Sequence, residues 1–156
     1  MEESELASPV DGRPRKVIIA GFGPVGRAIA GKLDAAGMDI VVIELNEQTI
    51  HRQRKLARTM VHGDVTDQRT LEEAGIHEAD ALILTIPDGE AVIQACELAR
   101  RLAPNIYIAA RTKHLSQGLL ATQAGADEVI VEEVVTAEAM QSAVQRHLVD
   151  DRQPAS

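Results

Sequence analysis

Aromatic side chains are almost absent from this chain of 156 residues, which holds Phe22, Tyr107 and no tryptophan. Proteins that bind single-stranded nucleic acid stack the bases on aromatic rings, so this composition excludes that class of function. An excess of basic residues is also lacking, because the formal net charge is −8. A chain this acidic is a poor ligand for nucleic-acid phosphates and for anionic membrane surfaces. We therefore expect no nucleic-acid partner.

Cysteine occurs once, as Cys96, which excludes an intramolecular disulfide and suits a reducing compartment. Within a helical segment we expect this thiol to fill the core rather than to react. No run of about 18 apolar residues is present, and a membrane-spanning helix needs one of that length. The start at residues 1–5 lacks the basic and apolar regions of a secretory signal. We therefore expect a cytoplasmic protein without direct membrane insertion.

The chain does contain a regular alternation of short apolar segments and longer amphipathic ones. Runs rich in Val and Ile, typical of strands buried on both faces, fall at residues 16–20, 39–43, 59–62, 81–85, 106–110 and 128–131. Helical periodicity follows at residues 24–36, 46–58, 67–74, 88–102, 116–124 and 136–148. Asn46, Asp67 and Asp88 suit the N-cap position of their helices. Six βα units predict an α/β fold, a Rossmann-like, doubly wound, six-stranded parallel sheet with helices on both faces.

The two ends of the chain differ from this pattern. Residues 1–14 are polar and contain proline and glycine, so we predict a disordered arm or linker there. Residues 149–156 are predicted to be a disordered tail. One domain is expected between them, over residues 15–148.

A glycine motif directly follows the first predicted strand and opens the first helix. The motif residues are Gly21, Phe22, Gly23, Pro24, Val25 and Gly26. Gly21 permits a tight turn, Gly23 lets the backbone approach a pyrophosphate, and Gly26 lets helix and strand pack closely. The phosphates of a nucleotide then face the positive end of the helix. Because the motif lies between strand and helix, we interpret it as a phosphate-binding loop rather than as a plain turn.

An acidic residue ends the second predicted strand. Glu44 lies 21 residues after Gly23, where a carboxylate accepts hydrogen bonds from the ribose hydroxyls of an adenosine. The same charge repels a 2′-phosphate, so NAD is favoured over NADP. Leu45 and Asn46, which follow, are included in the predicted site. An adenosine ribose is common to NAD(H), AMP, ADP and ATP, so Glu44 does not choose among them.

The carboxyl ends of the next strands are expected to border the same crevice. After the third strand, Gly63, Asp64 and Val65 are predicted to approach the adenine, with an Asx turn at Asp64 as the equal alternative. Thr85 ends the fourth strand at the topological switch point. Arg111 ends the fifth and faces an anionic group, another subunit or a surface acid.

Several ordered runs together resemble a known family. They are Val-Ile-Ile-Ala-Gly-Phe-Gly-Pro-Val-Gly-Arg at 17–27, Val-Ile-Glu-Leu-Asn at 42–46, Gly-Asp-Val-Thr at 63–66, Leu-Glu-Glu-Ala-Gly-Ile at 71–76, Ala-Arg-Thr at 110–112 and Ala-Gly-Ala-Asp-Glu-Val-Ile at 124–130. The chain resembles the regulator-of-potassium-conductance domain, also called the TrkA N-terminal or KTN domain, over about residues 16–148. The first two runs are most similar to the cytosolic domain of Kef-type monovalent cation:proton antiporters.

This resemblance implies a regulatory domain rather than an enzyme. It implies binding of NAD(H), AMP, ADP or ATP, assembly as a homodimer, and control of a membrane cation channel or antiporter at the inner face of the membrane. Many members carry arginine where this chain has Pro24, so recognition of terminal phosphates is not carried over. The last predicted helix is apolar on one face, and we predict that it packs on a second subunit, with packing on its own sheet as the alternative.

A small NAD-dependent oxidoreductase is the alternative function. A dehydrogenase of this fold usually needs a second domain or long insertions to hold its substrate. Here the six βα units account for the whole predicted domain. The five histidines are scattered, and we expect none to pair with a carboxylate in the crevice as a general base would. The acidic pairs at 72–73 and 132–133 are predicted to be solvated. We therefore expect no catalytic residues and no metal site.

Overall fold

The computed structural model describes residues 12–150, and strands and helices alternate along the chain. The strands are β1 (Lys16–Ala20), β2 (Asp39–Glu44), β3 (Met60–His62), β4 (Ala81–Leu84), β5 (Tyr107–Thr112) and β6 (Glu128–Val131). The helices are α2 (Pro24–Ala35), α3 (Glu47–Lys55), α4 (Gln68–Glu73), α5 (Gly89–Leu102), α6 (Leu115–Gln123) and α7 (Glu132–Leu148). Asn46, Asp67 and Asp88 each accept a backbone N–H as N-caps, which confirms those three predictions.

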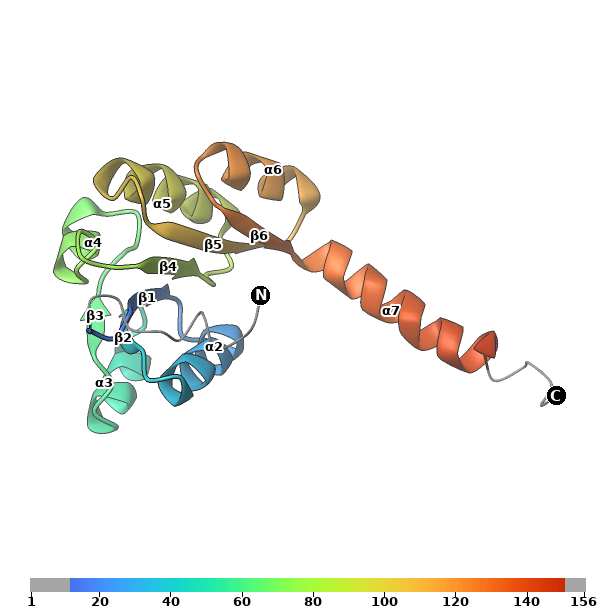
Figure 1. The fold of residues 1–156 in the computed structure, drawn as a ribbon, viewed down its shortest axis with the longest axis horizontal. Coiled ribbons are helices and arrows are strands. Elements are labelled where there is room, and N and C mark those ends of the chain that lie inside the picture. The colour runs from blue at the N-terminus through green and yellow to red at the C-terminus, as the bar shows by residue number, and fades with distance from the viewer. Residues whose placement is uncertain (1–11, 151–156) are drawn as a thin grey trace.

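The six strands form one parallel sheet in the order β3-β2-β1-β4-β5-β6. Helices α2 and α3 cover one face, and α4, α5 and α6 cover the other (Figure 1). The order reverses between β1 and β4, which start the two halves of the sheet. This is the predicted doubly wound architecture, and ligands of such sheets bind at the carboxyl ends beside the reversal.

Two apolar cores lie on the two faces of the sheet. The larger core packs β-strand residues such as Ile18 and Leu84 against α5, and the smaller packs Val42 against α2 and α3. Cys96 lies fully buried in the larger core, as predicted. Burial raises the pKa of its thiol to about 11, so the sulfur is held in its unreactive protonated form.

Helix α7 departs from the layered body. It begins at Glu132 rather than at the predicted residue 136, because the Glu133 N–H donates to the Lys113 carbonyl and fixes the first turn. The helix projects away from the sheet (Figure 1), and none of its residues is buried. Packing on its own sheet, the alternative that the sequence left open, is therefore wrong. Of the predicted arm at 1–14 and the predicted tail at 149–156, residues 1–11 and 151–156 fall outside the described residues.

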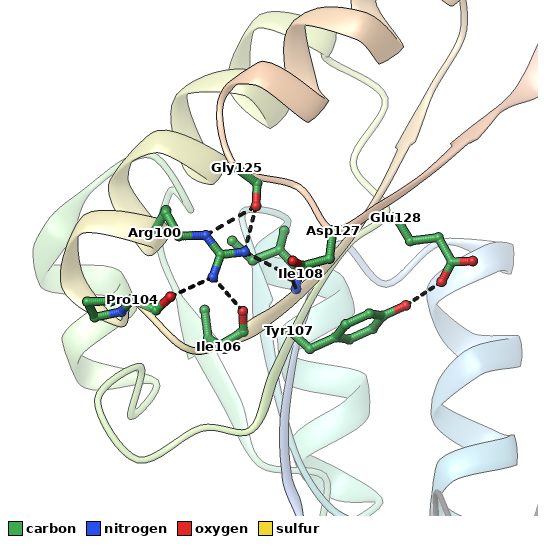
Figure 2. Close-up of polar contacts among 8 residues, drawn as sticks. All are labelled: Arg100, Pro104, Ile106, Tyr107, Ile108, Gly125, Asp127 and Glu128. Carbon is green, nitrogen blue, oxygen red and sulfur yellow. Dashed lines mark hydrogen bonds and ion pairs between the residues drawn. The ribbon is translucent and has the colours of Figure 1, made fainter. Parts of the chain in front are cut away.

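Arg100 joins the end of α5 to strands β5 and β6 (Figure 2). Its Nη1 donates to the carbonyls of Pro104 at 2.9 Å and Ile106 at 2.7 Å. Its Nε and Nη2 donate to the Gly125 carbonyl at 3.2 and 2.6 Å, and Nη2 also lies 2.8 Å from Oδ2 of Asp127. One guanidinium thus satisfies three backbone carbonyls that end or connect regular elements.

Tyr107, the only tyrosine in the chain, lies beside this cluster. Its hydroxyl donates to Glu128 Oε2 at 2.5 Å (Figure 2). Burial, followed by this hydrogen bond to a carboxylate, raises the pKa of Tyr107 to about 12 from an ordinary value of 10. Both causes favour the neutral phenol in the folded state.

We expect tyrosinate absorbance to appear with a midpoint near pH 12 in the folded protein and near pH 10 in denaturant. Because the pKa is raised on folding, its contribution to stability is complete below pH 10 and is lost as the pH rises toward 12. Glu128→Gln should lower the folded midpoint, while Glu47→Gln on distant α3 should leave it unchanged. Equal midpoints for the folded and denatured chains would contradict the assignment.

Candidate functional site

A cleft of about 520 Å³ opens at the carboxyl ends of the strands, beside the reversal in strand order. Eleven of the residues predicted for the site line it: Gly21, Phe22, Gly23, Pro24, Glu44, Leu45, Gly63, Asp64, Val65, Thr85 and Arg111. Val25, Gly26 and Asn46 were also predicted and do not line the cleft. The cleft also includes residues that the sequence analysis did not place there, namely Ala20, Ile43, Ile86, Pro87, Asp88 and Ala91.

Close backbone approaches shape the glycine loop. Gly21 has a φ of +98°, which L side chains rarely adopt, and a Cβ there would lie 2.9 Å from the Thr85 hydroxyl. A Cβ on Gly26 would lie 2.1 Å from the Gly21 carbonyl oxygen. At Gly23, by contrast, a Cβ would meet nothing within 4 Å. Gly21 and Gly26 therefore shape the loop from within, and Gly23 leaves open space on the cleft side.

Glu44 fastens the glycine loop to the end of β2. Its Oε2 accepts the N–H of Phe22 at 2.8 Å, and its Oε1 accepts the N–H of Asn46 at 3.1 Å. Each carboxylate oxygen keeps further acceptor capacity. Two backbone donors thus hold the Glu44 side chain at the cleft, and each of its oxygens can accept a further hydrogen bond.

The turn after β3 is built by local contacts. Asp64 Oδ1 accepts from the Thr66 N–H at 2.9 Å and from its hydroxyl at 2.7 Å, which is the Asx turn that the sequence left as one alternative. A Cβ on Gly63 would lie 2.4 Å from the Thr70 hydroxyl of α4. Thr70 of the following helix therefore leaves no room for a side chain at Gly63. The other carboxylate oxygen of Asp64, Oδ2, takes no part in the Asx turn.

Thr85 and Arg111 form the far wall of the cleft. The Thr85 hydroxyl donates to the carbonyls of Ala20 and Gly21 at 3.0 and 2.9 Å, so it positions the glycine loop. Arg111 lies within β5 rather than after it, and its Nη2 donates to the Thr85 carbonyl. Its Nη1 lies 3.4 Å from Oε1 of Glu132. Arg111 is the cationic residue of the cleft lining, which also holds Glu44 and two aspartates.

Glu132 and Glu133 have partners that the sequence did not indicate. Glu132 pairs with Arg111, and Glu133 accepts the Leu115 N–H at 2.7 Å and lies 3.2 Å from His114 Nδ1. The Leu115 N–H and then His114 lower the pKa of Glu133. The two side chains remain exposed, at 39% and 51%, in agreement with the prediction of solvated acids, and no local sequence signal indicates partners about 20 residues away.

Within residues 12–150, His, Cys, Asp and Glu side chains form no group of three suited to holding a metal ion. In the same range, no helix combines the length and apolar character that crossing a bilayer requires. The pair formed by His114 and Glu133 lies outside the cleft lining.

Comparisons with known proteins agree with this fold. The family model for the TrkA-N domain matches residues 17–132. The glutathione-regulated potassium-efflux system protein KefC of Escherichia coli O157:H7 is 32% identical over 127 residues, which cover 81% of this chain and 20% of KefC. The chain thus spans about a fifth of the length of that relative.

Two solved structures are similar along most of this chain. The TrkA-N domain of the inner membrane protein ybaL from Escherichia coli has a TM-score of 0.81 at 28% identity, covering 85% of this chain and 98% of that one. The structure of GsuK bound to ADP has a TM-score of 0.75 at 28% identity, covering 85% of this chain and 34% of that one. With the sheet order, the glycine loop and the acid at the end of β2 in place, the chain belongs to the TrkA-N domain family.

Proposed function

We propose that this domain binds an adenine nucleotide, NAD(H) or one of AMP, ADP and ATP, in the cleft and acts as a regulatory sensor. The open space at Gly23 beside the Glu44 carboxylate carries the proposal. A phosphate would accept hydrogen bonds from the backbone N–H groups at the start of α2. The ribose hydroxyls would donate to the free lone pairs of Glu44.

The named ligands of similar proteins support this choice. GsuK has been solved with ADP, and the GsuK channel with NAD, the latter at 25% identity and a TM-score of 0.67. Both ligands contain an adenosine ribose, the group to which Glu44 would bind in this proposal. The acidic lining at Glu44, Asp64 and Asp88 disfavours ligands that carry many negative charges, because only Arg111 opposes it.

The regulated partner in this proposal is a potassium or other monovalent cation channel or antiporter, as a separate subunit or as another part of the same polypeptide. The relatives KefC and GsuK support it, since the first is a potassium-efflux system protein and the second a channel. The domain would then act at the cytoplasmic face of the membrane. A ligand regulates such a partner only if it binds one arrangement of the domain better than another.

A homodimer is part of the same proposal. Helix α7 exposes Met140, Val144 and Leu148, and its own sheet covers none of them. Apolar side chains spaced in this way along one helix face suit packing against a second copy.

No catalytic step is proposed. The family supports a regulatory role, and the cleft lining lacks a histidine that could serve as a general base. Hydride exchange between bound NADH and an added carbonyl compound would overturn this and favour the oxidoreductase.

Thermal unfolding of the purified chain with AMP, ADP, ATP, NAD and NADH in turn tests the binding proposal. A ligand present at 100 times its dissociation constant adds about 2.7 kcal/mol. One or more of the five should raise the unfolding temperature, and NADP should raise it less than NAD. An unchanged temperature with all five would overturn the proposal.

Replacing Glu44 with alanine should weaken nucleotide binding by about 1–3 kcal/mol, roughly 5- to 150-fold, because the ribose hydroxyls lose a charged acceptor. Isothermal titration calorimetry measures this directly. Since Glu44 also holds the Phe22 N–H, Glu44→Gln should keep part of the loop contact and lose less affinity. Glu47→Ala removes an acid that lies outside the cleft and should leave binding unchanged. Equal affinity for wild type and Glu44→Ala would show that the cleft is not the binding site.

A further inference from the structure

Arg111 lies where the cleft meets the start of helix α7. Its side chain lines the cleft and donates from Nη2 to the Thr85 carbonyl. On its other side, Nη1 lies 3.4 Å from Oε1 of Glu132, the first residue of α7. One guanidinium therefore contacts both the cleft wall and the helix that projects from the body.

The placement of α7 depends on its first turn, because none of its residues is buried. Glu132 contacts Arg111 of β5, and Glu133 accepts the Leu115 N–H at the start of α6. The Glu133 N–H also donates to the Lys113 carbonyl. Releasing Glu132 would leave the Glu133 contacts in place and remove the contact between the first turn and Arg111 of β5.

The bond between Arg111 and Glu132 is well suited to exchange. Both side chains are partly exposed, at 26% and 39%, and pairs of this kind are weak. Within residues 12–150, Nε of Arg111 is the buried side-chain nitrogen that has no hydrogen-bond partner. A phosphate pairs with a guanidinium through stronger, charge-assisted and often bidentate hydrogen bonds.

The glycine loop and this guanidinium line the same cleft. The Thr85 hydroxyl donates to the Gly21 carbonyl, while the Thr85 carbonyl accepts from Arg111. Thr85 thus contacts both the loop and the guanidinium. The competing carboxylate, Glu132, contacts the other terminal nitrogen of Arg111, Nη1.

We propose that Arg111 exchanges partners when a nucleotide binds: the ligand phosphate takes the guanidinium from Glu132, and the first turn of α7 loses its contact with β5. This inference rests on the proposed function, nucleotide binding in the cleft, and adds the route by which occupancy changes the placement of α7. Coupling between two sites is reciprocal. Glu132 must therefore oppose the binding of any ligand whose phosphate competes for Arg111.

The first test compares Glu132→Gln with wild type by calorimetry, using AMP and adenosine as probes. AMP should bind the variant about two- to fivefold more tightly, the range expected for an exposed ion pair. Adenosine, which has no phosphate, should bind both proteins equally. Glu133→Gln removes the same charge one residue away and should leave AMP affinity unchanged, which separates competition from a general loss of negative charge.

A second test follows α7 itself. Spin labels at Gln94→Cys on α5 and Ser142→Cys on α7, both exposed positions, report the distance between body and helix, and buried Cys96 stays unlabelled. Labelled chains are diluted with unlabelled ones so that distances within one chain are read. AMP should shift the distance distribution, adenosine should not, and Glu132→Gln should be shifted before AMP is added.

The outcomes separate this inference from the function on which it rests. Failure of AMP, ADP, ATP, NAD and NADH to bind the wild type would overturn the proposed function and the exchange together. AMP binding with equal affinity to wild type and Glu132→Gln would overturn the exchange alone. Equal gains in Glu132→Gln and Glu133→Gln would also overturn it, since charge alone would then explain the effect.

Discussion

Replacing Gly26 with alanine should destabilise the domain by about 3 kcal/mol and abolish nucleotide binding. The new Cβ would lie 2.1 Å from the Gly21 carbonyl oxygen, and forcing an atom into so close a contact costs about 1–3 kcal/mol or more. The obstacle is backbone, so no side-chain rotation relieves it. The loop must move, and with it the N–H groups aimed at the phosphate. Thermal unfolding should show a midpoint lowered by about 10 °C, at roughly 2–4 °C per kcal/mol.

Helix α2 offers a matched control in Gly31. A Cβ there would meet nothing within 4 Å, and alanine is a better helix former than glycine by about 1 kcal/mol. Gly31→Ala should therefore raise the unfolding temperature and leave nucleotide affinity unchanged. The same substitution five residues apart is thus expected to act with opposite sign. A Gly26→Ala protein with wild-type stability and binding would contradict the proposed role of the loop.

Replacing Arg100 with methionine should destabilise the domain by about 2–4 kcal/mol. The methionine keeps much of the apolar stem but leaves the carbonyls of Gly125 and Ile106 without their charged donor, and each bond to a charged group contributes about 1.5–3 kcal/mol. We expect less than the sum of the bonds, because the side chain is 27% exposed and water can replace part of them. Urea-induced unfolding measures the difference.

Two controls make the Arg100 result specific. Arg101→Met changes the neighbouring arginine of the same helix, which is exposed, and should alter stability by no more than about 0.5 kcal/mol. Nucleotide affinity should be unchanged in Arg100→Met, since Arg100 is absent from the cleft lining. A loss below 1 kcal/mol would mean that water satisfies these carbonyls as well as the guanidinium does.

The sheet and the glycine loop could be predicted because their signals are local. A run of Val and Ile such as Lys16–Ala20 specifies a strand buried on both faces by its own residues. Gly26, at the start of the next helix, could be recognised from its spacing to Gly21 and Gly23, because a side chain at this position would prevent the close packing of helix and strand. The end of β2 was predicted for the same reason, since Glu44 follows an apolar run at a fixed distance from the loop.

The contacts that were missed join segments far apart in the chain. The partner of Arg111 is Glu132, which no periodicity links to it. Gly63 suggested an approach to adenine, whereas the side chain that excludes a Cβ is Thr70 of the following helix. The start of α7 was placed late because Val134 and Val135 are weak helix formers, and the Glu133 contacts that overcome this are tertiary.

Helix α7 also has a mechanical consequence that follows from its length. Its 17 residues, anchored at Glu132, extend about 25 Å at 1.5 Å per residue. A rotation of about 10° at the anchored end would displace the far end by about 4 Å, on the order of a helix turn. A small rotation at Glu132, which need not disturb the sheet, would thus move Leu148 by a distance comparable to the size of a side chain. Any partner in contact with Leu148 would experience that displacement.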